Sequence, residues 1–180
     1  MTNSDPIVRS ATEADLEYMT GIGTSERKNV GFLPKQAYAD YVLSKHAAVV
    51  VANDDPVGFM LFGSHGKHHL VRTPGTVPIM LCVVQPDARR ILHGTSLVEY
   101  LLNHPATTHA ATIALWCRED LPANKFWQEL GFTPNGRRLR HRIRKPSIMH
   151  NRWIMPIAAP IAAQLELPFT MTTEDCSKTE

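Results

Sequence analysis

The chain has 180 residues and a mass of 20.1 kDa, a length typical of one globular domain. Its residues are 43% hydrophobic and 20% charged, which excludes a wholly disordered chain, a collagen-like repeat and a disulfide-rich scaffold. The 19 Lys and Arg against 17 Asp and Glu give a net charge of +2, too small to indicate a polyanionic partner by itself.

The first half of the chain predicts one strand, two helices and a β-hairpin. Thr12 with Asp15 three residues later is typical of a helix start, and Pro34 suits the first turn of the second helix. The alternation and β-branched residues that follow indicate two strands joined by a polar turn. In order, the segments are residues 7–9, a helix from residue 12, a helix over 34–45, a strand over 47–52, a turn at 53–56 and a strand around 57–61.

The second half predicts a buried strand, a helix, a strand, a helix and a last hairpin. Helical periodicity indicates the first of these helices, and Asp120 is expected to cap the second, which ends at Gly131. The segments are residues 77–84, 89–102, 112–117, 120–131, and 137–144 paired with 148–156 around a turn at 145–147. We expect a domain over 1–156 and a C-terminal arm and flexible tail over 157–180.

Cysteine usage and the absence of targeting segments predict a cytoplasmic protein. Cys82, Cys117 and Cys176 are odd in number and widely spaced, which suits a reducing compartment better than a disulfide framework. They also lack the spacing of a metal site. No stretch approaches the ~18 apolar residues of a membrane span, and the N-terminus does not resemble a secretory signal. We expect no membrane partner and no metal.

Two arginines open the helix predicted over residues 89–102. A helix N-terminus exposes unpaired N–H groups and can hold a phosphate or pyrophosphate, and Arg89 and Arg90 add positive charge there. Gly94 would let a ligand approach the backbone closely. The alternative is that two surface arginines open a helix without any ligand.

Three segments of the chain resemble the GNAT family of acyl-CoA-dependent N-acyltransferases. IVRSATEADLEYM resembles the family's opening strand and helix. VVQPDARRILHGTSLVEYLL resembles the acyl-CoA motif, in which V-x-P precedes Q/R-x-x-G-x-G/A, and ALWCREDLPANKFWQELGF resembles the later A-x-x-F-Y-x-x-x-G-F block. The resemblance implies an α/β (α+β) fold with a mixed, mostly antiparallel twisted sheet flanked by helices. It also implies direct transfer of an acyl group, most simply acetyl, from acetyl-CoA or another acyl-CoA to an amine.

The resemblance implies an acyl-CoA site between the fourth and fifth strands. Arg89 matches the first basic residue of the acyl-CoA motif and Gly94 its last small one, whereas Leu92 stands where the family has its first glycine. Main-chain groups at the end of strand 77–84 would polarise the thioester carbonyl. The residues placed against the acyl-CoA are Cys82, Val83, Val84, Arg89, Arg90, Ile91, Leu92, His93, Gly94, Thr95, Asn124 and Trp127.

The sequence does not assign the general acid or base. Trp127 stands where many family members have a tyrosine that protonates the departing thiolate, and an indole N–H is too weak an acid for this. We expect Trp127 to pack, and Cys117 to be a small core residue rather than a nucleophile. No Asp or Glu lies on strand 77–84, so the base is either a water chain or one of His68, His69, Glu119 and Asp120.

Basic residues concentrate in the last hairpin, at Arg137, Arg138, Arg140, Arg142, Arg144, Lys145 and Arg152. On a strand, the arginines at even positions from 138 to 144 share one face, where they repel one another unless an anion lies nearby. One reading is a solvated edge strand that resists aggregation. The others are a phosphate track for DNA or RNA, or a site for an anionic small substrate or partner protein.

Three functions therefore stand open. The first is an N-acyltransferase for a small-molecule or macromolecular amine. The chain could also form a homodimer. The second is an enzyme of the same fold that modifies a base in DNA or RNA, guided by the basic strand 137–144. The third is a catalytically degenerate binding module, for which Leu92 and Trp127 argue.

Overall fold

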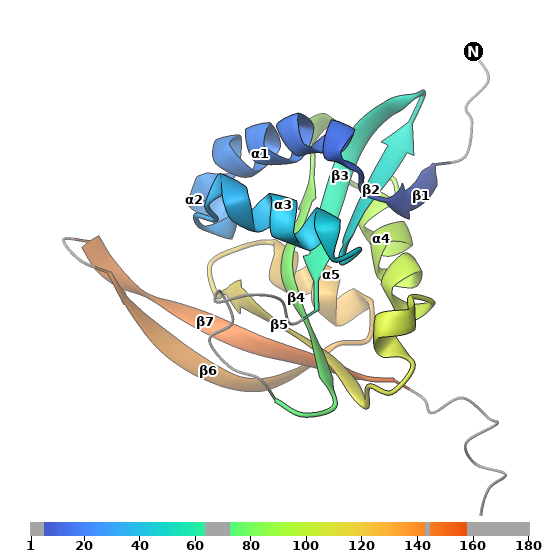
Figure 1. The fold of residues 1–180 in the computed structure, drawn as a ribbon. Helices are drawn as coiled ribbons and strands as arrows, with labels where there is room; N and C mark the ends of the chain where they lie inside the picture. The colour runs from blue at the N-terminus through green and yellow to red at the C-terminus, as the bar shows by residue number, and fades with distance from the viewer. Residues whose placement is uncertain (1–5, 64–72, 143–144, 158–180) are drawn as a thin grey trace, which may run out of the picture.

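Seven strands form a single sheet in the order β1-β2-β3-β4-β5-β7-β6 (Figure 1). The computed structural model describes residues 6–63, 73–142 and 145–157. All neighbouring strands are antiparallel except β4 and β5, which are parallel. The strands are β1 (Ile7–Ser10), β2 (Ala47–Ala52), β3 (Asp55–Phe62), β4 (Thr76–Val84), β5 (Thr112–Arg118), β6 (Thr133–Arg142) and β7 (Lys145–Pro156).

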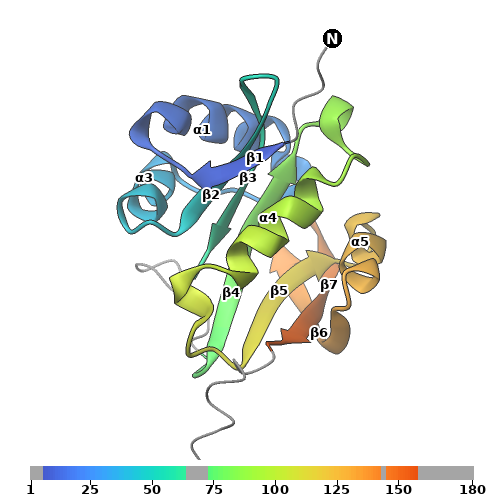
Figure 2. The same cartoon turned by 90° about the vertical axis from the view of Figure 1, so that its right-hand side faces the viewer.

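Helices cover both faces of the sheet (Figures 1 and 2). They are α1 (Leu16–Ser25), α2 (Arg27–Val30), α3 (Lys35–Leu43), α4 (His93–Leu102) and α5 (Ala123–Glu129), with short 3-10 turns η1 (Glu13–Asp15), η3 (Pro86–Ala88) and η4 (Pro105–Thr107). None of the helices in the described ranges has the length and apolar character needed to cross a membrane.

Alternating side chains on the strands build two hydrophobic cores. On one face, Met19 of α1 and Tyr41 of α3 pack with Val49 and Phe59 of the sheet. The other face carries α4 and α5, and its buried residues include Val50, Leu97, Leu101, Leu115, Cys117, Trp127 and Trp153. A strand such as β2 contributes to both cores because its successive side chains point to opposite faces of the sheet. Cys117 is the buried core residue that the sequence predicts.

The sheet splits between β4 and β5. These strands pair only from Thr76 to Pro78, opposite Thr112 to Ala114. Just beyond, Leu61 of β3 lies opposite Leu81 but Phe62 lies opposite Ile79, so β4 carries one extra residue, Met80. A β-bulge of this kind bends its strand. Beyond it β4 stays paired with β3, while β5 stays paired with β7, and a gap opens between β4 and β5.

The predicted strands and the longer helices occur in the predicted order, but the short helix α2 was not predicted and several boundaries are wrong. Strand β3 begins at Asp55, inside the segment predicted as a turn. Helix α4 begins at His93 rather than Arg89, because Leu92 has a left-handed backbone (φ 67°) that cannot lie inside a helix. Helix α5 begins at Ala123 after Pro122, because the Asp120 carboxylate pairs with Arg118 instead of capping the helix.

The boundaries of the last hairpin are also wrong, since β6 begins at Thr133 rather than residue 137. Strand β7 begins at Lys145 rather than residue 148, so the segment predicted as a turn lies in the strand. Arg144 and most of the predicted C-terminal arm lie outside the described residues. Ile157 is described, and its N–H donates to the Ala111 carbonyl at 2.9 Å, extending the pairing of β7 with β5.

The predicted start of the first helix is confirmed and is held by one buried carboxylate. Asp15 Oδ2 accepts hydrogen bonds from the Thr12 N–H at 2.7 Å and from Arg9 Nη1 at 2.7 Å, and Oδ1 accepts from Arg9 Nη2 at 2.9 Å. The Arg9 guanidinium is the main cause that holds the pKa of Asp15 below its ordinary value. The ionised carboxylate therefore stabilises the fold.

We predict that Asp15→Asn lowers the free energy of unfolding by about 2 kcal/mol at pH 7, because hydrogen bonds to a charged group are lost. A lowered pKa gives stability that is present at neutral pH and is lost as pH falls through it. The difference between the two proteins should therefore shrink below about pH 4. Urea unfolding at several pH values measures this. The exposed Glu13→Gln, in the same turn, is the control and should change little at any pH.

Candidate active site

Main-chain groups at the end of β4 face the gap between β4 and β5. The Gln85 N–H donates to the Val57 carbonyl at 2.9 Å, so its main chain points toward β3. Because these directions alternate along a strand, the main chain of Val83 also points toward β3, and that of Cys82 and Val84 points into the gap. Consistent with this, the Val84 carbonyl accepts a hydrogen bond from Arg89 Nε at 2.9 Å. The gap is therefore lined by main-chain donors and acceptors of Cys82 and Val84.

A tight loop leads from β4 to the N-terminus of α4. Arg90 and Leu92 both have left-handed backbone conformations, with φ of 68° and 67°. His93 begins the helix and is 5% exposed, and its Nδ1 makes no hydrogen bond within the described part of the chain. A buried unpartnered nitrogen beside the unpaired N–H groups of a helix start favours an oxygen-rich ligand or water at this place.

Arg89 connects this loop to the corner between α1 and α2. Its Nη2 lies 3.1 Å from Glu26 Oε2, while its Nε holds the Val84 carbonyl. The Glu26 side chain is only 14% exposed. The charge of Arg89 is thus largely balanced within the fold, and the exposed Arg90 is better placed for an external anion. Glu26 was not among the predicted site residues, and no motif in the sequence connects it to Arg89.

Three other predicted cofactor residues have packing roles in the fold. Trp127 is 5% exposed, and its ring lies 4.8 Å from that of Phe126 and 5.3 Å from that of Phe132. A Cβ on Gly94 would come 2.9 Å from the Phe126 ring, so the glycine lets α4 and α5 approach closely. Asn124 donates to the Arg118 carbonyl at 2.7 Å and accepts from Trp153 Nε1 at 3.0 Å, which ties α5 to β5 and β7.

The candidate bases that the structure describes are engaged with arginines. Glu119 pairs with Arg137, and Asp120 pairs with Arg118. Arg118 holds the pKa of Asp120 below its ordinary value, which makes this carboxylate a weaker base. Both lie just beyond β5, at the open end of the gap. His68 and His69 lie outside the described residues.

Burial makes both described cysteines poor nucleophiles. It raises the pKa of Cys117 to about 11 and that of Cys82 to about 12, so each is a neutral thiol at physiological pH. A covalent intermediate on either cysteine is therefore disfavoured.

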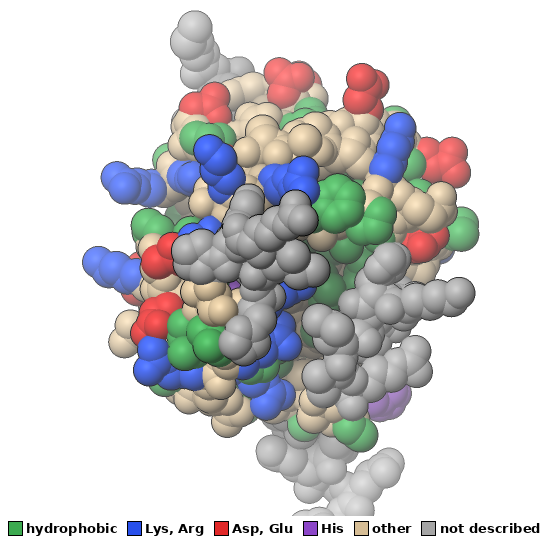
Figure 3. All heavy atoms as spheres, turned by 90° about the vertical axis from the view of Figure 1, so that its left-hand side faces the viewer, with side chains coloured by type: hydrophobic (Ala, Val, Ile, Leu, Met, Phe, Trp, Pro, Cys, Tyr) green, Lys and Arg blue, Asp and Glu red, His purple; other side chains and the backbone are tan. Residues whose placement is uncertain are grey.

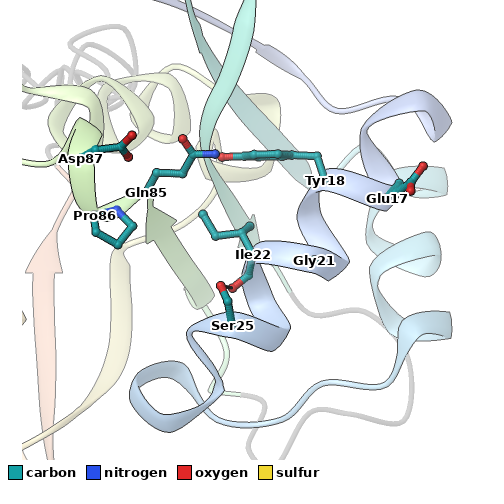
Figure 4. A pocket seen from close by; sticks show the side chains of 8 residues that line it. All are labelled: Glu17, Tyr18, Gly21, Ile22, Ser25, Gln85, Pro86 and Asp87. Atoms are coloured by element: carbon teal, nitrogen blue, oxygen red, sulfur yellow. Dashed lines mark hydrogen bonds between the residues drawn. The ribbon is translucent and has the colours of Figure 1, made fainter.

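An open pocket of about 530 Å³ lies between α1 and the end of β4 (Figure 4). Its walls are Glu17, Tyr18, Gly21, Ile22, Ser25, Gln85, Pro86 and Asp87. The Tyr18 hydroxyl and the Gln85 amide point toward each other across it (Figure 4). Burial raises the pKa of Tyr18, so its hydroxyl stays protonated and can donate a hydrogen bond. The pocket lies on the α1 side of β4, where a second substrate could enter the gap.

Comparison with known families identifies the fold independently. The profile described as the acetyltransferase (GNAT) family matches residues 15–132. This range includes the helix start at Asp15, the loop before α4, and all of α5. No match was found among functionally curated proteins.

Solved structures of acetyltransferases have the same fold. An N-acetyltransferase from Staphylococcus aureus Mu50 superposes with a TM-score of 0.70 at 17% identity, over 86% of this chain and 100% of that one. The yncA protein of Salmonella typhimurium, solved with its cofactor acetyl-CoA, gives 0.70 at 16% identity, over 87% and 98%. The ribosomal-protein-S18-alanine N-acetyltransferase of Escherichia coli gives 0.64 at 18% identity, over 87% and 96%.

The left-handed backbone of Leu92 predicts that Leu92→Gly raises the free energy of unfolding by about 0.5–1 kcal/mol. Relief of the strained φ outweighs the extra chain entropy that glycine loses, and the leucine side chain, 73% exposed, gives up little packing. Its neighbour Ile91 is 58% exposed and has no positive φ, so Ile91→Gly is the matched control and should destabilise the protein. Urea unfolding of both variants measures the difference, and equal losses would contradict the prediction.

Proposed function

The chain belongs to the acetyltransferase (GNAT) family, and we propose that it transfers an acetyl group from acetyl-CoA directly to an amine while both substrates are bound. The observation that carries the proposal is the gap between β4 and β5, which is bordered by the main chain of Cys82 and Val84 and ends at the N-terminus of α4. An extended chain of amides, such as the pantetheine arm of CoA, can hydrogen-bond to an open strand edge as an added strand would.

The loop before α4 would hold the pyrophosphate of CoA. The N–H groups of residues 91–95 are free of partners inside the helix at its first turn, and the helix dipole favours negative charge there. Arg90 would add a guanidinium from the exposed side of the loop, and the unpartnered Nδ1 of His93 would face the same region. Arg89 would act indirectly, because its contacts with Val84 and Glu26 fix the shape of the loop.

The transfer needs no covalent enzyme intermediate. The amine nitrogen attacks the thioester carbonyl carbon, the carbon–sulfur bond breaks, and the electron pair of that bond leaves on the CoA sulfur. Main-chain N–H groups of β4 would stabilise the negative charge that forms on the carbonyl oxygen. Water would take the proton of the amine, because β4 carries no carboxylate and Glu119 and Asp120 are paired with arginines. A thiol with a pKa of about 8.5 can leave as the thiolate without being protonated first. The reaction therefore does not need a tyrosine in place of Trp127.

The amine would enter from the side of α1 and α2. The pocket lined by Tyr18 and Gln85 opens there, on the face of the sheet opposite α4 and α5. The likeness to an enzyme named for a ribosomal protein alanine supports a peptide or protein amine as the acceptor class. A base in DNA or RNA is the second candidate, and the concentration of arginines in β6 favours it.

Isothermal titration with acetyl-CoA tests the proposal. We expect a dissociation constant below about 1 mM, the usual range for enzyme substrates. Arg90→Gln should weaken binding by about five- to tenfold, because a charge-assisted contact with the pyrophosphate is lost. Lys125→Gln removes one positive charge from the exposed surface of α5 and should leave the affinity unchanged. No heat of binding at millimolar acetyl-CoA would refute the proposed function.

The packing of Trp127 predicts that its indole is needed for stability and not for the reaction. Because its indole lies between two rings and cannot protonate a thiolate, Trp127→Phe should lower stability by about 1–2 kcal/mol while kcat for acetyl transfer stays within about threefold of the unsubstituted protein. Release of the CoA thiol measures kcat. A loss of kcat by about a hundredfold or more in a folded variant would mean that the indole takes part in the reaction.

A further inference from the structure

A row of basic side chains crosses the three strands next to the gap. Arg118 of β5 lies opposite His150 of β7, and His150 lies opposite Arg138 of β6. Residues directly opposite one another in antiparallel strands project from the same face of the sheet. Trp116 shares this face with Arg118, and Arg140 shares it with Arg138, because side chains alternate along a strand. We refer to Trp116, Arg118, Arg138, Arg140 and His150 as the arginine face.

The cations of the arginine face are incompletely neutralised. The Arg138 guanidinium stacks over the Trp116 ring at 4.1 Å, and its Nε is buried without a hydrogen-bond partner in the described part of the chain. Burial and the nearby Arg140 lower the pKa of Arg138. Burial, then Arg138, Arg140 and Arg118, lower the pKa of His150. Only Arg118 has a carboxylate partner, Asp120, among the described residues of this face.

The arginine face begins at the border of the gap. Strand β5, which carries Trp116 and Arg118, is one wall of the gap, and the Arg118 guanidinium also donates to the Lys28 carbonyl of α2. The face therefore lies next to α2, on the side where the amine would enter. Figure 3 views the molecule from the side of the β6–β7 hairpin and shows several Lys and Arg side chains gathered there.

We infer that the arginine face binds the carboxylates of a peptide acceptor whose amine lies in the gap, an inference that rests on the proposed acetyl transfer. The planar guanidinium of arginine binds a carboxylate through two parallel hydrogen bonds. Three strands span about 10 Å, which suits carboxylates on a short stretch of extended peptide. An acidic residue that follows the acceptor amine would thus lie over Arg138 or Arg140, because Arg118 is already paired with Asp120.

Two observations favour a peptide over a nucleic acid. Arg138 covers one face of the Trp116 ring, which leaves less of this aromatic surface for a base to stack on. The pI of the whole chain is near 8.5, whereas nucleic-acid-binding domains typically have a pI above about 9. The positive charge is local, as recognition of a few carboxylates requires.

A matched peptide series tests the inference. The acceptors share one length and a free N-terminal amine, followed either by three aspartates or by three asparagines. With saturating acetyl-CoA, we expect the acidic peptide to have a KM at least about tenfold lower, and added salt to reduce this difference. Anisotropy of the same acidic peptide, labelled at its C-terminus, measures binding without any need for turnover.

Variants identify the surface responsible. Arg140→Gln, an exposed side chain outside the core, and Arg138→Gln should each weaken binding of the acidic peptide by about tenfold. Neither should alter the KM of the asparagine peptide or the affinity for acetyl-CoA. Lys125→Gln on α5 removes the same charge from another face and should have no effect on peptide binding.

Each outcome separates the inference from the proposed function. Equal KM values for the two peptides, with acetyl-CoA bound and turned over, would overturn the inference and leave the proposed function intact. Absence of acetyl-CoA binding would overturn the proposed function, and unchanged anisotropy with the acidic peptide would then overturn the inference as well. A single-stranded oligonucleotide of equal charge that binds more tightly than the acidic peptide, and loses affinity in Arg140→Gln, would identify a nucleic-acid surface and refute the peptide assignment.

Discussion

The extra residue in β4 is the constraint on which the rest of the structure depends. Met80 has no counterpart in β3, and the bend it produces separates β4 from β5 directly after their three paired residues. Neither strand can close the gap, because each is paired along its other edge and packed into a core. One local irregularity thus leaves a strand edge open inside a sheet that is otherwise continuous.

An open strand edge leaves polar main-chain groups to be satisfied. The fold meets this need in part with Arg89, which binds the Val84 carbonyl and is itself held by Glu26 of the α1–α2 corner. The same arginine therefore links the proposed cofactor side of the gap to the helices on the proposed acceptor side. Arg89 stands at a motif position that suggests direct contact with phosphate, yet in this protein its contacts favour a role in holding the two sides together.

Much of the fold could be predicted from the sequence because periodicity and turn residues are local signals. Such signals predict the strand over 47–52, the helix start at Thr12 and the packing of Trp127. They do not predict the bulge at Met80, since it arises from the register between two strands. The start of α4 was misplaced because a leucine occupies a left-handed position that usually needs glycine. The contact of Arg89 with Glu26 joins distant segments, which no pattern along the chain reveals.

The arginine face shows how a small net charge can hide a strong local one. Like charges side by side destabilise a sheet, and the fold reduces this cost by stacking Arg138 on Trp116 and pairing Arg118 with Asp120. Arg140 and His150 stay within the electrostatic reach of those arginines. An external anion would relieve the remaining repulsion and would itself lie beside the gap. The repulsion among these arginines, which destabilises the free protein, would then favour binding of an acceptor whose carboxylates lie next to its reacting amine.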